Sequence, residues 1–191
     1  MTFDWVNIKD VGDAIIEKYD SGDYVFNNFL IEKAREWQDS GETVTYVFVD
    51  SEEILTGAYS RIYGYASINT FGLYYGEADK NKCLPCVEIR MFSIAKELRK
   101  RHDPTIKWSE IVFKVLLQNL YNMSTSIVGF RAVFLYANTN GYNLYKECGF
   151  QEIDEYLIPE TDDKVEVEGC TPLLLVINDN AIYDMFDTDN I

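Results

Sequence analysis

The segment ANTNGYNLYKECGF, residues 137–150, carries the side chains whose spacing most suggests chemistry. Its pattern predicts the end of a strand, then a short helix with Tyr142 and Tyr145 one turn apart, and a stop at Gly149 before a buried Phe150. A phenolic hydroxyl both donates and accepts hydrogen bonds, so two of them on one helix can do more than pack. Asn138 precedes the helix and is predicted to cap its first turn.

Basic residues concentrate in one loop, although the chain is acidic. Five of the 17 lysines and arginines fall within a dozen positions, namely Lys96, Arg99, Lys100, Arg101 and Lys107. A helix predicted to begin at Trp108 and Ser109 follows, and the free N–H groups of its first turn point back at this loop. Positive side chains beside a helix N-terminus form a site for an anion.

A carboxylate is predicted on a central strand. The segment from residue 87 alternates with period two, so successive side chains lie on opposite faces. The two faces are Val87, Ile89 and Met91, and Glu88, Arg90 and Phe92. This pattern makes Glu88 a half-buried carboxylate.

Several other chemistries lack support in the sequence. There is one histidine, His102, and no G-x-S-x-G, HExxH, Walker or Rossmann motif. Cys83 and Cys86 form a C-x-x-C that precedes a strand pattern and not a helix, and Cys148 and Cys170 lack zinc-ligand spacing. We therefore predict free thiols and no metal site.

Helices and strands are interspersed along the chain. We predict a helix at 22–38, strands at 43–50 and 60–73 with a turn at 51–57 between them, and a loop at 74–86. After the strand from 87, a helix spans 108–123 and strands occupy 129–138, 151–159 and 171–179. This order predicts an α/β or α+β fold with a mixed sheet. Residues 1–191 are expected to form a single domain, with a core at 22–177 and an acidic tail at 178–191.

Composition restricts the class of protein. Hydrophobic residues make up 47% of the 191, and no apolar run approaches the ~20 residues of a membrane span. The first residues, MTFDWVNIKD, lack the features of a secretion signal, so a cytoplasmic location is expected. The formal charge of −15 repels phosphate backbones and argues against general nucleic-acid binding.

The order of these elements, with LPCVEIRMFSI, FRAVFLYANTN and GYNLYKECGF, resembles the GNAT superfamily of acetyl-coenzyme A dependent N-acetyltransferases. The pattern N-x-x-x-x-x-L-Y-x-x-x-G-F is the most specific part, and the resemblance covers residues 22–177. Residues 19–50 are also similar to the acetyltransferase subgroup that includes toxins of bacterial toxin–antitoxin pairs. The resemblance implies a central mixed, mostly antiparallel, splayed sheet flanked by helices.

The resemblance also implies a cosubstrate, acetyl-CoA. Its pantetheine arm would pair like an extra strand with the main chain of Phe92, Ser93 and Ile94. Its pyrophosphate would lie on the loop before the 108–123 helix, and Asn138 would orient water or backbone near the site. The candidate ligands in that loop and at the helix start are Arg99, Lys100, Arg101, Lys107, Trp108 and Ser109.

The same resemblance assigns roles to two residues. Tyr145 matches the tyrosine that commonly protonates the leaving thiolate, with a packing role as the alternative. Glu88 is the first candidate for the base that accepts the proton of the amine, directly or through water, with a surface carboxylate as the alternative. Tyr142, one turn before Tyr145, is a candidate neighbour in the same cleft.

One loop departs from the family pattern, which has glycines that let main-chain N–H groups surround the pyrophosphate. Here the loop is LRKRHDPTIKWSE and has none of them. Either basic side chains replace the main-chain contacts and Ser109 caps the helix, or the cosubstrate site is lost. In the second case the protein is a non-catalytic interaction module.

The amine acceptor is left open by the sequence. A cationic small molecule or a lysine-bearing protein suits an acidic chain. An aminoacyl-tRNA suits the toxin subgroup, provided that the basic residues at 96–107 suffice to bind tRNA. A toxin implies an antitoxin partner, and homodimers are common in the resembled family.

Overall fold

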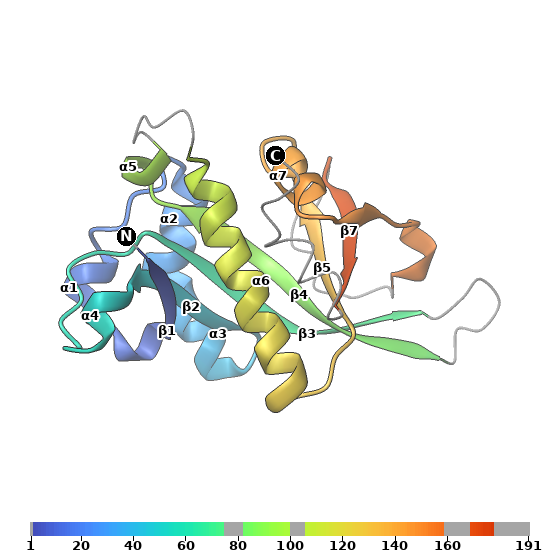
Figure 1. The fold of residues 1–191 in the computed structure, drawn as a ribbon, viewed down its shortest axis with the longest axis horizontal. Helices are drawn as coiled ribbons and strands as arrows, with labels where there is room; N and C mark the ends of the chain where they lie inside the picture. Colours follow the sequence, from blue (N-terminus) through green and yellow to red (C-terminus); the bar gives the residue numbers. More distant parts are fainter. Residues whose placement is uncertain (1, 75–81, 100–105, 159–168, 178–191) are drawn as a thin grey trace. The chain divides into compact units, whose positions relative to one another are not determined.

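The computed structural model describes residues 2–74, 82–99, 106–158 and 169–177. Seven strands form a sheet in the order β1-β2-β3-β4-β5-β7-β6, accompanied by helices (Figure 1). β4 pairs with β5 in parallel, whereas β1 with β2, β2 with β3, β5 with β7 and β6 with β7 are antiparallel. The predicted mixed, mostly antiparallel sheet flanked by helices is confirmed.

The elements have the following bounds. The strands are β1 Phe3–Asn7, β2 Val44–Asp50, β3 Gly64–Tyr74, β4 Cys83–Ile94, β5 Ala132–Ala137, β6 Gln151–Glu152 and β7 Thr171–Val176. The α-helices are α1 Asp13–Ile16, α2 Tyr24–Asn28, α3 Ala34–Ser40, α4 Ser51–Ile54, α5 Lys96–Arg99, α6 Trp108–Ser126 and α7 Tyr142–Glu147. The 3-10 turns are η1 Ile8–Asp10 and η3 Glu155–Leu157, and a π-helical turn, η2, spans Phe29–Lys33.

The predicted helix at 22–38 is confirmed as the run from α2 through η2 to α3. The Asp23 carboxylate accepts a hydrogen bond from the Val25 N–H at 2.9 Å and caps the start. Gly41, with φ of 82°, ends the helix in the left-handed conformation that glycine favours. β1 was not predicted, because five residues are too few for a periodic pattern and the strand exists by pairing with β2.

β4 begins earlier than the sequence suggested. It starts at Cys83 instead of residue 87, so the C-x-x-C lies in the strand and not in the predicted loop. The two cysteines of this motif differ in exposure: Cys83 is exposed and Cys86 is buried. Burial raises the pKa of the Cys86 thiol to about 11, which leaves it protonated at neutral pH.

The alternation predicted for β4 is wrong beyond Ile89. The guanidinium carbon of Arg90 lies 5.1 Å from the Trp37 ring centroid, and Met91 packs on the same core cluster that Trp37 joins. Phe92 instead meets Phe113 of α6, with 4.9 Å between ring centroids. Neighbouring residues of a regular strand cannot face the same side, so β4 has an irregularity of the kind that a β-bulge introduces.

Two short segments also differ from expectation. The predicted strand at 151–159 is a strand only at Gln151–Glu152, and a 3-10 turn follows at Glu155–Leu157. The predicted turn at 51–57 opens with helix α4, whose first turn is capped by the Asp50 side chain. At 154–158 the local hydrogen bonds of the 3-10 turn prevail over β-propensity.

The chain divides into two compact units. The first comprises residues 1–69 and 90–116, and its core includes Ile8, Leu30, Val47, Val49 and Tyr65. The second comprises residues 70–89 and 117–191, and its core includes Leu73, Cys86, Ala132 and Phe134. β3, β4 and α6 contribute residues to both units. That residues 1–191 form a single domain stays a prediction, and the acidic tail at 178–191 lies outside the described residues.

Tyr65 offers a test of the first core. Its ring is fully buried, and its hydroxyl donates to the carbonyl of Phe26 at 2.9 Å. Tyr65→Phe keeps the ring but removes this hydrogen bond, while the Phe26 carbonyl still accepts from the Phe29 N–H, so we expect the free energy of unfolding in urea to fall by about 1 kcal/mol. Tyr24→Phe, on a ring that is 79% exposed, is the control and should change it by less than about 0.5 kcal/mol. Equal losses would contradict a specific contribution from the Tyr65 hydroxyl.

Candidate functional site

Helix α7 is held by local hydrogen bonds at both ends. The Asn138 side chain accepts from the Gly141 N–H at 2.9 Å, and the Asn138 carbonyl accepts from the Tyr142 N–H at 3.0 Å. At the other end Gly149 has φ of 88°, and the N–H of the buried Phe150 donates to the Tyr145 carbonyl at 3.1 Å. The capping by Asn138 and the glycine stop are therefore confirmed.

Tyr145 is half-buried on α7, and its phenol is protonated at neutral pH. Its ring centroid lies 6.1 Å from that of Phe150. Burial raises the pKa of Tyr145 well above the ordinary phenol value, and negative charge on Cys148 or Cys170 would raise it further. A phenol in this state is a proton donor at neutral pH and not a base.

Gly141 makes room for the Tyr145 ring. A Cβ atom at Gly141 would lie 2.7 Å from Cε2 and 3.1 Å from the hydroxyl oxygen of Tyr145. The φ of Gly141 is −92°, which any residue can adopt, so the missing side chain is what matters here. Sequence reasoning missed Gly141, although its position four residues before Tyr145 is the spacing of neighbours on a helix face.

Tyr142 has a structural partner. Its hydroxyl donates to Oε1 of Glu152 on β6, and this hydrogen bond raises the pKa of Tyr142. The bond joins α7 to β6. Tyr142 therefore has a structural bond, and its role as a neighbour in the cleft stays a prediction.

Glu88 lies on β4 in register with Phe134 of β5. Phe134 and Tyr136 are two residues apart on β5 and so share a face of the sheet with Glu88. Burial raises the pKa of Tyr136, and the charges of Glu88 and Glu155 raise it further. Glu88 is half-buried, as predicted, and its carboxylate acts on a tyrosine that sequence reasoning did not single out.

The end of β4 contains the residues predicted to meet pantetheine. The register of β4 with β5 covers Cys86–Ile89, and β4 continues to Ile94. The Ser93 side chain is buried and accepts from the Tyr19 hydroxyl at 2.9 Å. The Ser93 side chain is therefore occupied. The predicted strand-like pairing with pantetheine would use the main chain of Phe92, Ser93 and Ile94.

Two of the basic residues have contacts within the protein. Arg99 donates from its guanidinium to the carbonyl of Ser21, and Lys96 Nζ lies 3.9 Å from Oδ2 of Asp20. Lys107 is exposed. Lys100 and Arg101 lie outside the described residues. Arg99 thus has a protein partner that no pattern in the sequence indicates.

The start of α6 differs from expectation in one respect. The Lys107 carbonyl accepts from the N–H groups of Glu110 at 3.0 Å and Ile111 at 3.1 Å, so Ser109 lies inside the first turn and does not cap it. The Trp108 ring meets Phe3 edge-on, with 5.9 Å between centroids. Its Nε1 is buried and has no hydrogen-bond partner among the described residues.

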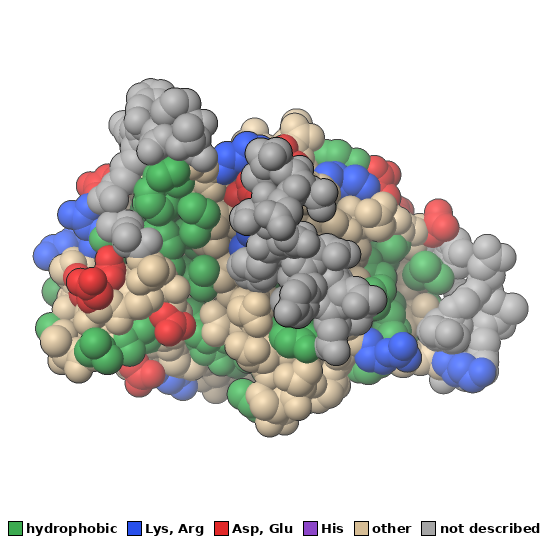
Figure 2. Space-filling model, viewed as in Figure 1, with side chains coloured by type: hydrophobic (Ala, Val, Ile, Leu, Met, Phe, Trp, Pro, Cys, Tyr) green, Lys and Arg blue, Asp and Glu red, His purple; other side chains and the backbone are tan. Residues whose placement is uncertain are grey.

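The candidate residues fall into two sets. Tyr145, Asn138 and Glu88 belong to the second unit, whereas Phe92, Ser93, Ile94, Arg99, Lys107, Trp108 and Ser109 belong to the first. On the face shown in Figure 2, lysines, arginines and acidic residues are scattered in small groups. In the described ranges no cluster of His, Cys, Asp and Glu is arranged to hold a metal ion. Likewise, no helix there is long and apolar enough to cross a bilayer.

No protein-family model and no curated protein matches the sequence. Solved structures do match along nearly the whole chain. A bacterial toxin has a TM-score of 0.69 at 14% identity, covering 99% of this chain and 97% of that chain. A Tyr-to-Phe variant of the toxin AtaT, bound to the C-terminus of the antitoxin AtaR and acetyl-CoA, has a TM-score of 0.68 at 16% identity, covering 98% and 99%.

A third solved structure, AtaT complexed with acetyl-methionyl-tRNAfMet, has a TM-score of 0.63 at 17% identity and covers 91% of this chain and 94% of that chain. At such identities the similarity shows the fold alone. The chain therefore has a GNAT-like fold, which these toxins share.

Gly141→Ala tests the packing of Tyr145. The added methyl overlaps the ring, so we expect the free energy of unfolding to fall by about 1–3 kcal/mol, measured by urea denaturation. Gly129→Ala is the matched control, because a Cβ there meets nothing within 4 Å, and it should be neutral or slightly stabilising. A neutral Gly141→Ala would show that the ring is free to move aside.

The raised pKa of Tyr145 predicts a dependence of stability on alkaline pH. The unfolded phenol loses its proton near pH ~10, whereas the buried phenol keeps it to higher pH. Above pH ~10 the unfolded state therefore binds fewer protons, and the free energy of unfolding falls as pH rises. In Tyr145→Phe this fall should be shallower by the contribution of one proton, as measured by urea unfolding from about pH 8 to about pH 11. An unchanged slope would contradict the burial of the phenol.

Proposed function

We propose that this protein is an N-acetyltransferase that moves the acetyl group of acetyl-CoA to a primary amine. The observation that carries the proposal is Tyr145, a half-buried tyrosine on α7 whose ring packs against Gly141 and near Phe150. The similar toxin AtaT is solved with acetyl-CoA, which supports the same cosubstrate here. The GNAT-like fold extends over nearly all of this chain, which supports the proposal further.

The residues at the end of β4 and the start of α6 fit acetyl-CoA. β4 continues beyond its register with β5, so the main chain of Phe92, Ser93 and Ile94 is suited to pair with the amide groups of pantetheine. Lys107 is exposed next to the first turn of a long helix, where free N–H groups and the helix dipole favour a phosphate. The buried Nε1 of Trp108, a donor without a described partner, is a further group for an anionic ligand.

Acetyl-CoA supplies a thioester, and the residues of this chain supply proton transfers. An amine attacks only as the free base, because its ammonium form has a pKa of about 10.4 and no lone pair. Glu88 accepts that proton, directly or through water. Tyr145 holds a proton at its hydroxyl at neutral pH and donates it to the sulfur that leaves. Its raised pKa makes it a weaker acid than an ordinary phenol, so the basicity of the leaving thiolate drives the transfer.

A second candidate is the toxin-type reaction, in which the amine is the amino group of an aminoacyl-tRNA. One specific observation favours it, namely that AtaT is solved with acetyl-methionyl-tRNAfMet. Under this candidate an antitoxin partner is expected, as AtaT has in AtaR. The charge of −15 opposes tRNA binding, so a tRNA substrate requires basic residues gathered in one place.

Tyr145→Phe tests the central assignment. Loss of the acidic hydroxyl should lower kcat about 100-fold or more, because a general acid contributes typically 10²–10⁴-fold. Acetyl-CoA should still bind, and at ~100 times its Kd it should stabilise both proteins by ~2.7 kcal/mol in thermal unfolding. Acetyl transfer is measured on a panel of polyamines, amino sugars, a lysine-bearing protein and methionyl-tRNA.

Tyr142→Phe is the control, since its hydroxyl bonds to Glu152 and should leave kcat within about threefold. An active Tyr145→Phe would remove the proton-donor role. No stabilisation of the wild-type protein by acetyl-CoA would favour the non-catalytic interaction module. Acetylation of methionyl-tRNA alone, with a steep loss at higher salt, would establish the toxin-type reaction.

A further inference from the structure

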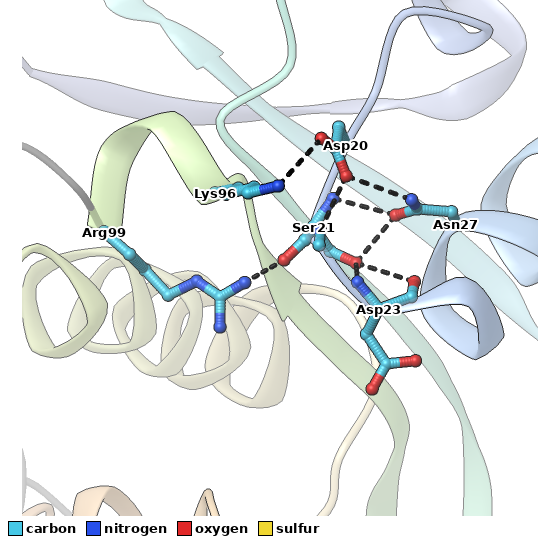
Figure 3. A network of polar contacts seen from close by, with 7 residues as sticks. Asp20, Ser21, Asp23, Asn27, Lys96 and Arg99 are labelled. Carbon is cyan, nitrogen blue, oxygen red and sulfur yellow. Dashed lines mark hydrogen bonds and ion pairs between the residues drawn. The ribbon is translucent and has the colours of Figure 1, made fainter.

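Segment Asp20–Asp23 lies at the centre of a polar network that the proposed chemistry does not use (Figure 3). On one side it contacts α5. The Lys96 N–H donates to the Asp20 carbonyl at 2.8 Å, and the Arg99 guanidinium donates to the Ser21 carbonyl. Lys96 Nζ lies 3.9 Å from the Asp20 carboxylate. Main chain and side chains of α5 therefore both reach this segment.

On its other side the segment forms the start of α2. Oδ1 of Asn27 accepts from the Ser21 N–H at 2.8 Å and from the Ser21 hydroxyl at 2.7 Å. Nδ2 of Asn27 donates to Asp20 at 3.2 Å, and Asp23 caps the helix through the Val25 N–H. Ser21 is only 2% exposed, so its hydrogen bonds are not easily replaced by water. The first turn of α2 is thus tied to the residues that α5 holds.

Two further contacts tie the segment to β4 and α5. The Tyr19 hydroxyl donates to Ser93 Oγ at 2.9 Å in the buried interior. Gly22 has φ of 78°, and a Cβ there would lie 3.2 Å from Lys96 Cδ and 3.5 Å from Nη2 of Arg99. The segment cannot shift against α5 without losing close contacts on both sides of Ser21.

We propose that Arg99 is a positioning residue, which holds segment Tyr19–Asp23 and the first turn of α2 against the end of β4, and is not a phosphate ligand. A guanidinium bonded to a carbonyl is a charge-assisted hydrogen bond, stronger than a neutral one. A phosphate would have to draw Arg99 away from Ser21 or share it. A positioning role explains why a basic residue occurs at position 99, which the sequence analysis assigned to acetyl-CoA binding.

The inference deepens the proposed function and rests on it in one respect. Ser93, which anchors Tyr19, belongs to the segment of β4 proposed to pair with pantetheine. Binding of acetyl-CoA along that segment and ordering of residues 19–27 are then linked, so that each favours the other. The Tyr19–Ser93 hydrogen bond carries this linkage, and Arg99 holds the neighbouring Ser21 in place.

Amide hydrogen exchange, read by mass spectrometry on the full chain, tests the role. In Arg99→Gln the amides of residues 19–27 should exchange about tenfold faster than in the wild type. Calorimetry should give a Kd for acetyl-CoA within about threefold of the wild-type value. Acetyl-CoA should slow exchange at 19–27 in the wild type and also in Arg99→Gln, because the Tyr19–Ser93 hydrogen bond is kept. Arg99→Lys, which keeps a charged donor, should restore part of the protection.

Two variants serve as controls. Arg61→Gln removes a guanidinium that pairs with Glu97 of the same helix α5 at 2.6 Å, and it should leave exchange at 19–27 unchanged. Gly22→Ala keeps Arg99 but crowds the contact between the segment and α5. It should speed exchange at 19–27 as Arg99→Gln does, with acetyl-CoA binding again retained.

The outcomes separate the two proposals. Weakening of acetyl-CoA binding by about tenfold or more in Arg99→Gln overturns the positioning role, because the guanidinium is then a ligand. Unchanged exchange at 19–27 in Arg99→Gln overturns it as well. If the wild-type protein does not bind acetyl-CoA, the proposed function fails, and the exchange rates without ligand still decide whether Arg99 holds the segment.

Discussion

β4 has neighbours on both edges and packs on both faces, and its irregular course sets the directions of the side chains at its end. It lies between β3 and β5 in the sheet. Arg90 and Met91 both turn toward the cluster that contains Trp37, and Phe92 turns to Phe113. An interruption of this kind costs ladder hydrogen bonds and persists where packing compensates. The core of the first unit therefore decides which groups the end of β4 presents.

Charge in this protein is used for positioning more than for attraction. The chain carries 32 acidic and 17 basic residues, and several of the basic ones have internal partners. Arg99 bonds to Ser21, and Arg61 pairs with Glu97. Ion pairs at exposed positions contribute at most about 1 kcal/mol, so such a pair as Arg61 with Glu97 adds little to stability. A hydrogen bond from a cation to the carbonyl of a buried residue fixes a segment in one place.

The two tyrosines of α7 have different roles because their environments differ. Tyr142 bonds to a carboxylate at the surface and joins α7 to β6. Tyr145, one turn later, is desolvated among Phe150 and Cys148, and Gly141 leaves space for its ring. Burial disfavours the phenolate, so Tyr145 stays protonated at neutral pH, although the same raised pKa makes it a weaker acid. The same residue type thus serves structure at one position and suits proton donation at the next.

The sequence by itself determined the features that depend on neighbours in the chain. The cap from Asn138, the stop at Gly149 and helix α6 follow from local hydrogen bonds and from periodic burial, so their patterns are readable. The half-burial of Glu88 followed in the same way from alternation along β4. Tertiary structure decided the rest, because the deciding partners are distant in sequence. Ser21 and Arg99 are 78 residues apart, Tyr19 and Ser93 are 74 apart, and the break at Arg90 depends on Trp37. No pattern within β4, α5 or α7 records such partners, since a contact between distant segments exists only once the chain has folded.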